Sequence, residues 1–411
     1  MTEQTLDRQA IDDEPQIGRS PLLVIFLTVF IDLLGFGIVI LLIPFYAQSF
    51  GATKFEVGLL FASYSIMQFL FAPIWGRISD AVGRRPIILL CLLGTSISFT
   101  FFGMAESLLV LFAARIAAGL FGGVISTAYA FIADVTTREQ RARGMGLLGA
   151  AFGLGFILGP SIGGVMAEAW GYPAPAYFAA GLALANFILA WFVLPESNPP
   201  DNRERPGRRK QVGGILSFIQ LRQALEKPSV RILLLLYFII AFALSNMEAT
   251  YALMTEEIFD WGARENGYVF GYIGIIMVLV QGVLIHPLVR KFGEHALILL
   301  GIILLVPSLG LLPFSPNLAI LLLLSGLMAF GSGINSPSLT SVISKSVTAD
   351  EQGGTMGLTL SLGSLARVVG PLWGGFTFGV IGYTAPYWTA AIFMTCAAII
   401  ATVLLIRQKN T

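Results

Sequence analysis

The sequence predicts an all-α membrane protein of twelve transmembrane helices, built as two pseudo-symmetric six-helix bundles. Three observations predict this fold: an apolar composition, the recurrence of long apolar segments, and the confinement of basic residues to alternate loops. Hydrophobic residues make up 56% of the 411 residues and charged residues only 12%, whereas a soluble globular chain carries roughly 25% charged residues. Apolar segments long enough to cross a hydrocarbon core of about 30 Å recur from Pro21 almost to Arg407.

Charged and Gly/Pro-rich breaks divide these segments into twelve. In the first half we expect helices at 21–48, 55–76, 86–105, 108–134, 140–167 and 174–195. In the second half we expect helices at 230–256, 265–289, 295–313, 317–344, 353–381 and 385–406. The predicted organisation is a tail (1–20), an N-terminal bundle (21–195), a linker (196–229), a C-terminal bundle (230–406) and a second tail (407–411).

The basic residues give these segments a direction. Of the 25 Lys and Arg residues, all but four lie in the tails, the linker and one set of alternate loops. The exceptions are Lys54 and Arg264 in the opposite loops, and Arg115 and Arg367 within predicted helices. Cytoplasmic loops carry the basic excess, so we expect a multi-pass inner-membrane protein with both termini and the linker in the cytoplasm. The basic cluster at 203–210 is interpreted as an anchor near anionic lipid.

Several function classes are excluded. Residues 1–18 are polar and acidic and precede no small-residue cleavage site, so we expect no secretory signal. A net charge of +1 indicates no nucleic-acid partner, and the chain has no Gly-Lys pair, so it has no Walker A loop for an ATP-driven pump. Cys91 and Cys396 lie in apolar segments and indicate neither a disulfide nor a metal site. We therefore expect a monomeric non-enzyme without cofactor or metal.

An internal repeat relates the two halves. The segments 139–146 and 351–357 both begin with Glu-Gln and end with Met-Gly. Thirteen residues after each final glycine comes Gly-Pro, at 159–160 and at 370–371, and Gly-Gly follows in both halves. Parallel repeats of this kind place a substrate site at the interface of the halves, and rocking of one half against the other provides alternating access.

Four motifs carry a resemblance to a known family. They are Gly-x-x-x-Asp-x-x-Gly-Arg-Arg at 76–85, Arg115-x-x-x-Gly119-x-x-x-Gly123, Gly155-x-x-x-Gly159-Pro160-x-x-Gly163-Gly164, and Asp32 followed by Gly35, Gly37 and Pro44. With them the chain resembles the major facilitator superfamily over residues 20–407, and most closely its tetracycline–proton antiporter branch. Ser98 and Leu305 stand where that branch has further intramembrane aspartates, which argues against tetracycline as the substrate.

The resemblance implies how the transporter is gated. Asp80 would cap the helix that begins near Gly353 and lock an outward-facing state, and Arg84 would pair with Asp134. Residues assigned to conformational gating are Gly76, Asp80, Gly83, Arg84, Arg85, Asp134, Gly155, Gly159, Pro160, Gly163, Gly164, Gly370 and Pro371. The alternative for 76–86 is a solvated turn held by its basic residues.

Four ionisable residues lie within predicted spans, where each is a functional candidate. We assign Asp32, Arg115, Glu248 and Arg367 to proton coupling. Asp32 and Arg115 are candidate partners, and Glu248 and Arg367 differ in depth by only about 5 Å at 1.5 Å rise per residue, so they are expected to pair or to share a substrate. The alternative is a static buried ion pair in each half.

Uncharged polar residues are candidates for the walls of a substrate cavity. They are Tyr64, Gln68, Asn186, Tyr237, Asn246, Tyr251, Gln281 and Asn335. The alternative for each is an interhelical hydrogen bond.

The leading functional prediction is a secondary active transporter that exports small amphipathic organic compounds in exchange for protons, with lipids as its surroundings and the proton gradient as its energy source. Two alternatives stay open: a proton-linked uptake symporter or facilitator of a polar metabolite such as a sugar, and a non-transporting membrane receptor on the same scaffold.

Overall fold

The computed structural model describes residues 19–136, 138–198 and 227–409, and their regular secondary structure is helical. The N-terminal bundle contains α2 (Arg19–Ser49), α3 (Lys54–Val82), α4 (Arg84–Gly103), α5 (Leu108–Leu120), α6 (Val124–Val135), α7 (Arg138–Trp170) and α8 (Pro173–Val193). The C-terminal bundle contains α10 (Pro228–Phe259), α11 (Ala263–Leu279), the π-helix η2 (Val280–Leu284), α12 (Ile285–Phe292), α13 (Glu294–Leu311), the short 3-10 helix η3 (Leu312–Phe314), α14 (Leu318–Lys345), α15 (Ala349–Val380) and α16 (Ala385–Lys409). Most of both predicted tails and of the linker, including the basic cluster 203–210, lies outside the described residues.

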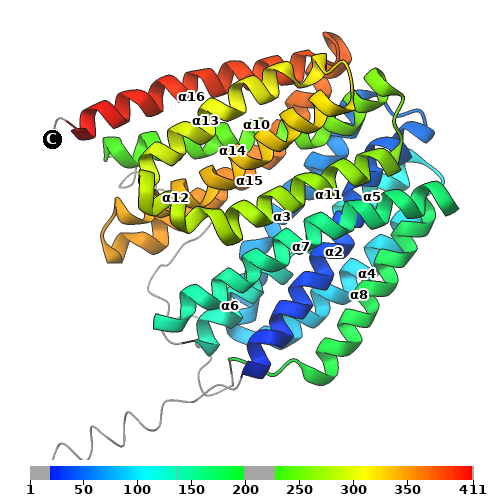
Figure 1. The fold of residues 1–411 in the computed structure, drawn as a ribbon. Helices are drawn as coiled ribbons and strands as arrows, with labels where there is room; N and C mark the ends of the chain where they lie inside the picture. Colours follow the sequence, from blue (N-terminus) through cyan, green and yellow to red (C-terminus); the bar gives the residue numbers. More distant parts are fainter. Residues whose placement is uncertain (1–18, 137, 199–226, 410–411) are drawn as a thin grey trace, which may run out of the picture.

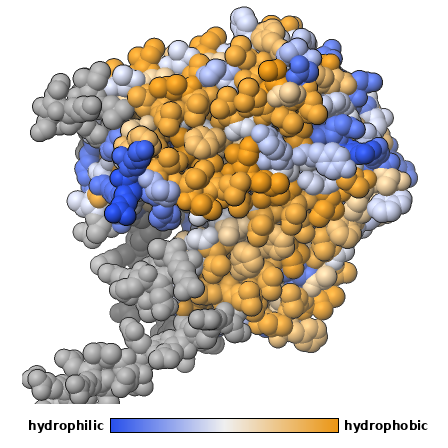
Figure 2. Space-filling view, viewed as in Figure 1, coloured by the Kyte–Doolittle hydropathy of each residue, from blue (hydrophilic) through white to orange (hydrophobic). Residues whose placement is uncertain are grey.

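The described helices have the length and composition of membrane spans. Eleven of them qualify, with α5 and α6 counted as one span and α11 to α12 as another. The remaining long helix, α15, has Arg367 and many glycines in its sequence, which lower its apolar content. Figure 2 shows a broad apolar band across the bundles, with hydrophilic residues gathered toward the helix ends. The fold is therefore an all-α membrane fold, as the sequence predicts.

The fourth span, predicted at 108–134, is present at Leu108–Val135, but a break divides it into two helices. α5 ends at Leu120 and α6 begins at Val124. Glycines weaken a helix, and α3 side chains take the carbonyls that the break releases: the Trp75 indole N–H donates to the Leu120 carbonyl at 2.6 Å. A Cβ on Gly123 would lie 2.7 Å from the Trp75 ring, so the indole fits only against glycine.

Backbone geometry confirms the internal repeat. Residues with positive φ occur at three corresponding turns of the two halves. They are Gly51 and Asp260, Gly83 and Gly293, and Gly171 and Gly382, which are 209, 210 and 211 residues apart. Backbone with positive φ strongly favours glycine. This explains why glycine stands both at position 83, in the motif at 76–85, and at the corresponding position 293.

The two bundles meet at one end of the molecule. We call the end where α3 passes into α4 at Gly83 the basic end, and the opposite end, where α3 and α11 begin, the far end. α7 packs against α2 in its own bundle and against α11 of the other, and α15 packs likewise against α10 and α3. In Figure 1 the bundles converge at the far end and separate toward the basic end.

The apolar core follows the same division. One buried cluster runs continuously from the far halves of α2 and α3 into the C-terminal bundle. A second cluster, in the basic half of the N-terminal bundle, is separate from it. Hydrogen bonds and ion pairs join the two bundles on the far side: Gln48 with Glu256, Lys54 with Glu256, Ser161 with Gly267, and Glu168 with Arg264. The structure is thus closed at the far end.

Candidate functional site

A pocket lies between the bundles, on the inner side of the far-end closure. The pocket is narrow, and its walls come from α2, α3, α7, α10 and α11. The lining residues are Ile40, Leu41, Pro44, Phe61, Phe156, Pro160, Glu248, Ala252 and Phe270. Glu248 is the only ionisable residue in this wall. A carboxylate at an apolar surface is costly unless it takes up a proton or meets a cation, so the pocket has the chemistry of a coupled site.

Glu248 and Arg367 do not form the direct ion pair that their depths suggested. The structure has no bond within 4.0 Å between these two described residues; instead, an Arg367 Nη2 donates to Ser364 Oγ at 3.2 Å, one turn earlier in α15. The Arg367 side chain is exposed rather than buried. One turn earlier on α15, Gly363 packs against Tyr237 of α10, the helix that carries Glu248. Glu248 and Arg367 therefore do not neutralise each other in this structure.

Arg115 in the N-terminal bundle is stabilised by an aromatic ring rather than by Asp32. It is only 1% exposed, and its guanidinium carbon lies 4.5 Å from the centroid of the Tyr64 ring. Gln68 donates to the Tyr64 hydroxyl at 3.2 Å. The Nε and Nη1 of Arg115 have no hydrogen-bond partner in the described structure. The suggested pairing of Arg115 with Asp32 is therefore not formed here, because the arginine lies over the ring instead.

Asp32 is the second carboxylate within the spans. It lies on α2, and no ion pair or hydrogen bond of its carboxylate is found among the described residues. Asp32 lies one helical turn before Phe36, whose ring is 5.1 Å from the Tyr64 ring, so it lies on the side of α2 that faces the Tyr64 cluster. In the described structure, each bundle thus has one carboxylate in the interior of its spans, Asp32 or Glu248, that no salt bridge neutralises.

Aromatic residues connect the Tyr64 cluster with the pocket. The Phe36 ring lies 5.1 Å from the Tyr64 ring and 5.9 Å from the Phe156 ring, centroid to centroid, and Phe156 lines the pocket. Sequence reasoning missed these two phenylalanines. Nothing distinguishes them in sequence from the other members of a set of 31, many of which face lipid.

Three predicted cavity residues lie elsewhere. Asn186, Asn246 and Asn335 are fully buried. Each donates its side-chain amide to a carbonyl of a neighbouring helix: Thr28 at 2.8 Å, Pro386 at 2.7 Å and Ile298 at 3.4 Å. This placement supports the alternative interpretation, that these residues are interhelical hydrogen bonds, and gives no support for a role in the cavity wall.

Of the other predicted cavity residues, some lie away from the intramembrane charges and some lie near them. Tyr251 is buried, and its hydroxyl bonds Ser325 of α14 at 2.8 Å. Gln281 is exposed on η2. Tyr237 faces Gly363 of α15, where a Cβ would lie 3.1 Å from the tyrosine hydroxyl. Tyr64, Gln68 and Tyr237 are therefore the predicted cavity residues that the structure places near the intramembrane charges.

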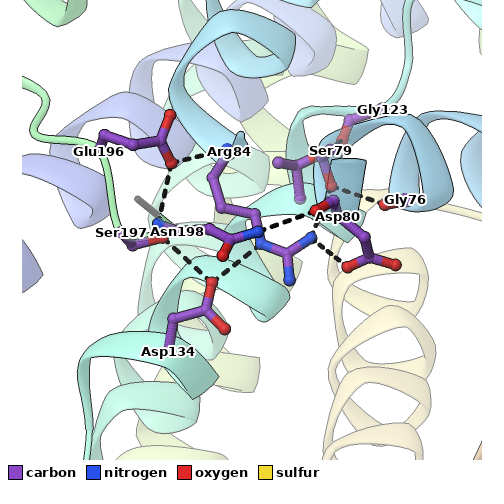
Figure 3. Close-up of polar contacts among 10 residues, drawn as sticks. Gly76, Ser79, Asp80, Arg84, Gly123, Asp134, Glu196, Ser197 and Asn198 are labelled. Carbon is purple, nitrogen blue, oxygen red and sulfur yellow. Dashed lines mark hydrogen bonds and ion pairs between the residues drawn. The ribbon is translucent and has the colours of Figure 1, made fainter. Parts of the chain in front are cut away.

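A polar network joins α3, α4 and α6 at the basic end (Figure 3). The expected ion pair is present: Arg84 Nε lies 2.9 Å from Asp134 Oδ2. A second nitrogen of the same guanidinium lies 2.5 Å from Asp80 Oδ1 and 2.8 Å from Ser79 Oγ. The planar fork of arginine suits several acceptors at once, so one buried side chain links three helices.

The first residues after α8 complete this network, and sequence reasoning missed them. Glu196 accepts from the backbone N–H groups of Arg84 at 2.8 Å and Arg85 at 3.2 Å, the first residues of α4. A carboxylate at a helix N-terminus is favourable because the first N–H groups there lack helical partners. Asn198 donates to the Asp80 carbonyl at 2.9 Å. The proposed contact of Asp80 with α15 belongs to the opposite conformation and stays a prediction, as does the role of Gly76, beside which a Cβ would meet nothing within 4 Å.

The Gly-Pro motif of α7 forms packing surfaces on two sides. Gly155, Gly159 and Gly163 lie against α2; a Cβ on Gly159 would be 2.7 Å from the α-carbon of Gly37. On the other side, Pro160 and Gly164 face α11 of the second bundle. A Cβ on Gly267 would lie 2.6 Å from the Pro160 carbonyl oxygen. The motif therefore forms part of the far-end closure.

The duplicate motif of α15 repeats this arrangement. Gly370 and Gly374 lie against α10, whereas Pro371 and Gly375 face α3 of the first bundle. The Pro371 carbonyl meets Gly58, which is 209 residues before Gly267. Two matching Gly-Pro seams therefore close the far end, one on each side of the pseudo-symmetry axis. Gly58 and Gly267 were not singled out from the sequence, although their spacing matches the repeat.

Comparison with known proteins places the chain in a family. Residues 25–306 and 279–411 match the family model of the Major Facilitator Superfamily. The class C tetracycline resistance protein of Escherichia coli is 32% identical over 385 residues, which cover 93% of this chain and 95% of that protein. Multidrug resistance protein 1 of Bacillus subtilis (strain 168) is 31% identical over 384 residues, with 92% and 95% covered.

Solved structures agree with this placement. The crystal structure of the human organic anion transporter MFSD10 superposes with a TM-score of 0.70 at 27% identity and covers 93% of this chain and 99% of that one. The nucleoside transporter NupG has a TM-score of 0.77 at 11% identity, covers 93% and 99%, and supports the fold alone.

Proposed function

Because the chain belongs to the major facilitator superfamily and is a membrane transporter rather than an enzyme, we propose that it exports small amphipathic organic compounds in exchange for protons. The observation that carries this proposal is the position of Glu248, a carboxylate without a salt bridge in the described structure, in the wall of an apolar pocket between the bundles. Such a group binds a proton when the pocket is empty of other cations. A compound that enters the pocket can displace that proton.

We propose that the transport cycle proceeds by alternating access, in which the pocket opens first to one end of the molecule and then to the other. The far end is closed in this structure by two Gly-Pro seams and by polar contacts between the bundles. Rocking of the bundles about the pocket would open these contacts and bring the basic end together, where Asp80 would meet α15. Asp32 and Glu248, one in each bundle, are proposed to take up protons from the far side and release them at the basic side.

The proposed orientation places the basic end in the cytoplasm, because basic loops stay there. It is tested by labelling intact cells with a membrane-impermeant maleimide. In a chain with Cys396, which is exposed, replaced by serine, Glu106→Cys at the far end should react and Arg290→Cys at the basic end should not. The reverse pattern would overturn the orientation.

The relatives support export over uptake. The matched proteins include tetracycline resistance and multidrug resistance proteins over more than nine-tenths of the chain. The Gly-Pro motif of α7 also resembles the motif typical of drug antiporters. An uptake symporter and a non-transporting receptor are the competing functions, and no contact in the described structure favours either of them.

The direction of coupled proton movement separates these functions. Purified protein is reconstituted into vesicles with an acidic interior and a trapped pH-sensitive dye, and tetracycline, ethidium or an aromatic zwitterion is added outside. An antiporter releases protons as compound enters, so the interior becomes alkaline faster. A symporter carries protons inward with the compound and acidifies it further. A receptor changes neither rate.

A further inference from the structure

Arg367 occupies an interior face of α15, although it is exposed. Gly363 and Gly370 of this helix face α10, and Pro371 and Gly375 face α3. Arg367 is four residues before Pro371 and three before Gly370. Residues three and four apart share one side of a helix, so Arg367 lies on the side of α15 that faces α10 and α3, one turn nearer the basic end. In that direction the two bundles separate (Figure 1). The guanidinium therefore lies in the space between the bundles rather than in lipid.

The repeat identifies the opposite wall. Gly159 and Gly370 are equivalent by the duplicated motif, at a spacing of 211 residues, and the same spacing relates Phe156 to Arg367. Phe156 lies one turn from its seam proline, Pro160, and lines the pocket. At one depth, the N-terminal bundle thus presents an aromatic ring and the C-terminal bundle a guanidinium.

Glu248 and Arg367 are opposite charges of the same bundle that remain apart. Within the described residues no carboxylate lies within 4.0 Å of Arg367, which donates a hydrogen bond to the neutral hydroxyl of Ser364. Glu248 opens onto the pocket between Phe61, Phe156 and Phe270. An ionised side chain inside a span needs a partner of opposite charge, so both groups are available to a ligand that brings those charges.

We propose that the transported compound is an amphipathic zwitterion whose anionic group binds Arg367, whose cationic group binds Glu248, and whose apolar body rests on Phe156. This inference rests on the proposed function, because it names the substrate class of the same pocket. It also explains exchange with a proton. The cationic group and a proton compete for the Glu248 carboxylate, while Arg367 holds the anionic group in a bidentate geometry that suits a carboxylate.

Three probes with one aromatic body test the assignment. They are 6-(aminomethyl)-2-naphthoate, a zwitterion; its N-acetyl derivative, an anion; and its carboxamide, a cation. Binding to purified protein is followed by naphthalene fluorescence. We expect the zwitterion to bind at least about tenfold more tightly than either relative, a difference equivalent to about 1.4 kcal/mol.

Two variants should remove the two halves of this preference separately. Arg367→Gln should abolish the advantage of the zwitterion over the carboxamide and keep its advantage over the N-acetyl probe. Glu248→Gln should do the reverse. Arg290→Gln, which removes one exposed positive charge at the basic end, is the matched control and should leave both ratios unchanged.

This crossed pattern is one that a merely structural role would not produce. Equal affinity for the three probes, or the same loss of preference in both variants, would overturn the inference. If ethidium, which is a cation and no zwitterion, still drives proton exchange in that case, the proposed export function stands and only the zwitterion assignment falls. If no compound of any charge moves protons, the proposed function itself falls.

Discussion

Gly267 of α11 lies against the backbone carbonyl of Pro160 of α7, so closely that a Cβ on the glycine would be 2.6 Å from the oxygen. The same relationship joins Gly58 of α3 to Pro371 of α15 on the other side of the molecule. Glycine is needed at each point because two helix backbones from different bundles touch there. A side chain at either glycine should therefore act on the conformational equilibrium rather than on the fold of one bundle.

We expect Gly267→Val to disfavour the closed far end by about 1–3 kcal/mol, the usual cost of an overpacked contact. Spin labels on Glu106→Cys and Leu318→Cys, placed at the far end of each bundle in a chain with Cys396→Ser, should report longer distances. Gly181→Val is the control, because a Cβ at Gly181 would meet nothing within 4 Å. Unchanged distances in the Gly267 variant would show that the contact between Gly267 and Pro160 does not hold the far end closed.

Lys54 and Arg264 are the two basic residues of the far-side loops, and both form ion pairs across the bundles. Lys54 Nζ lies 3.7 Å from Glu256 Oε2, and Arg264 Nη1 lies 2.8 Å from Glu168 Oε1. Lys54→Gln should weaken closure by at most about 1 kcal/mol, since exposed pairs contribute little. The same spin labels measure this effect, and the exchange of charges in Lys54→Glu with Glu256→Lys should restore it. No recovery in the exchanged variant would mean that the pair does not hold the bundles.

Asp32→Asn should abolish proton exchange, because asparagine keeps the shape of the side chain and cannot carry a proton at this position. The pH-sensitive dye in the reconstituted vesicles measures the exchange. Membrane insertion and melting temperature should stay close to the parent, since Asp32 forms no ion pair in the described structure. Compound-driven proton movement at the parent rate would remove Asp32 from the coupling pathway.

Tyr64→Leu should lower stability more than Tyr64→Phe. Both variants lose the hydroxyl that Gln68 bonds, but only leucine removes the ring over which Arg115 lies. A cation–π contact in a desolvated site contributes about 2 kcal/mol, and that difference should appear in unfolding of the purified protein. Equal stability of the two variants would show that Arg115 is held in another way.

Arg84→Gln should destabilise the basic end, because one guanidinium bonds Asp134, Asp80 and Ser79. A double-mutant cycle with Asp134→Asn should give a coupling energy of about 0.5–3 kcal/mol, the range for residues in one network. Thermal unfolding in detergent measures it. Additive effects of the two substitutions would show that the ion pair contributes nothing to stability.

Much of the fold follows from the sequence because a membrane permits few structures. Backbone groups in hydrocarbon must bond within helices, so apolar length locates every span except α15, whose apolar content is lower. The duplicated Gly-Pro segments identify the repeat, and the positive φ values of Gly83 and Gly293 agree with it. The ion pair of Arg84 and Asp134 also followed from a motif, because both residues lie at helix ends that the topology brings together.

The details of the site did not follow. The break after Leu120 depends on Trp75 of another helix, and hydropathy carries no information about it. Asn186, Asn246 and Asn335 looked like cavity residues, yet each bonds a neighbouring backbone. A polar side chain in a span is equally compatible with either use until the rotation of its helix is known.

The sequence by itself determined that this protein crosses the membrane as two related bundles and that four charges lie within the spans. Only the tertiary structure decided how those charges are used: Arg115 lies over Tyr64, Glu248 opens onto the pocket, and Arg367 bonds Ser364 rather than Glu248. The physical reason is that spans are specified by local hydropathy, whereas the partners of a buried charge are set by contacts between helices that are distant in sequence.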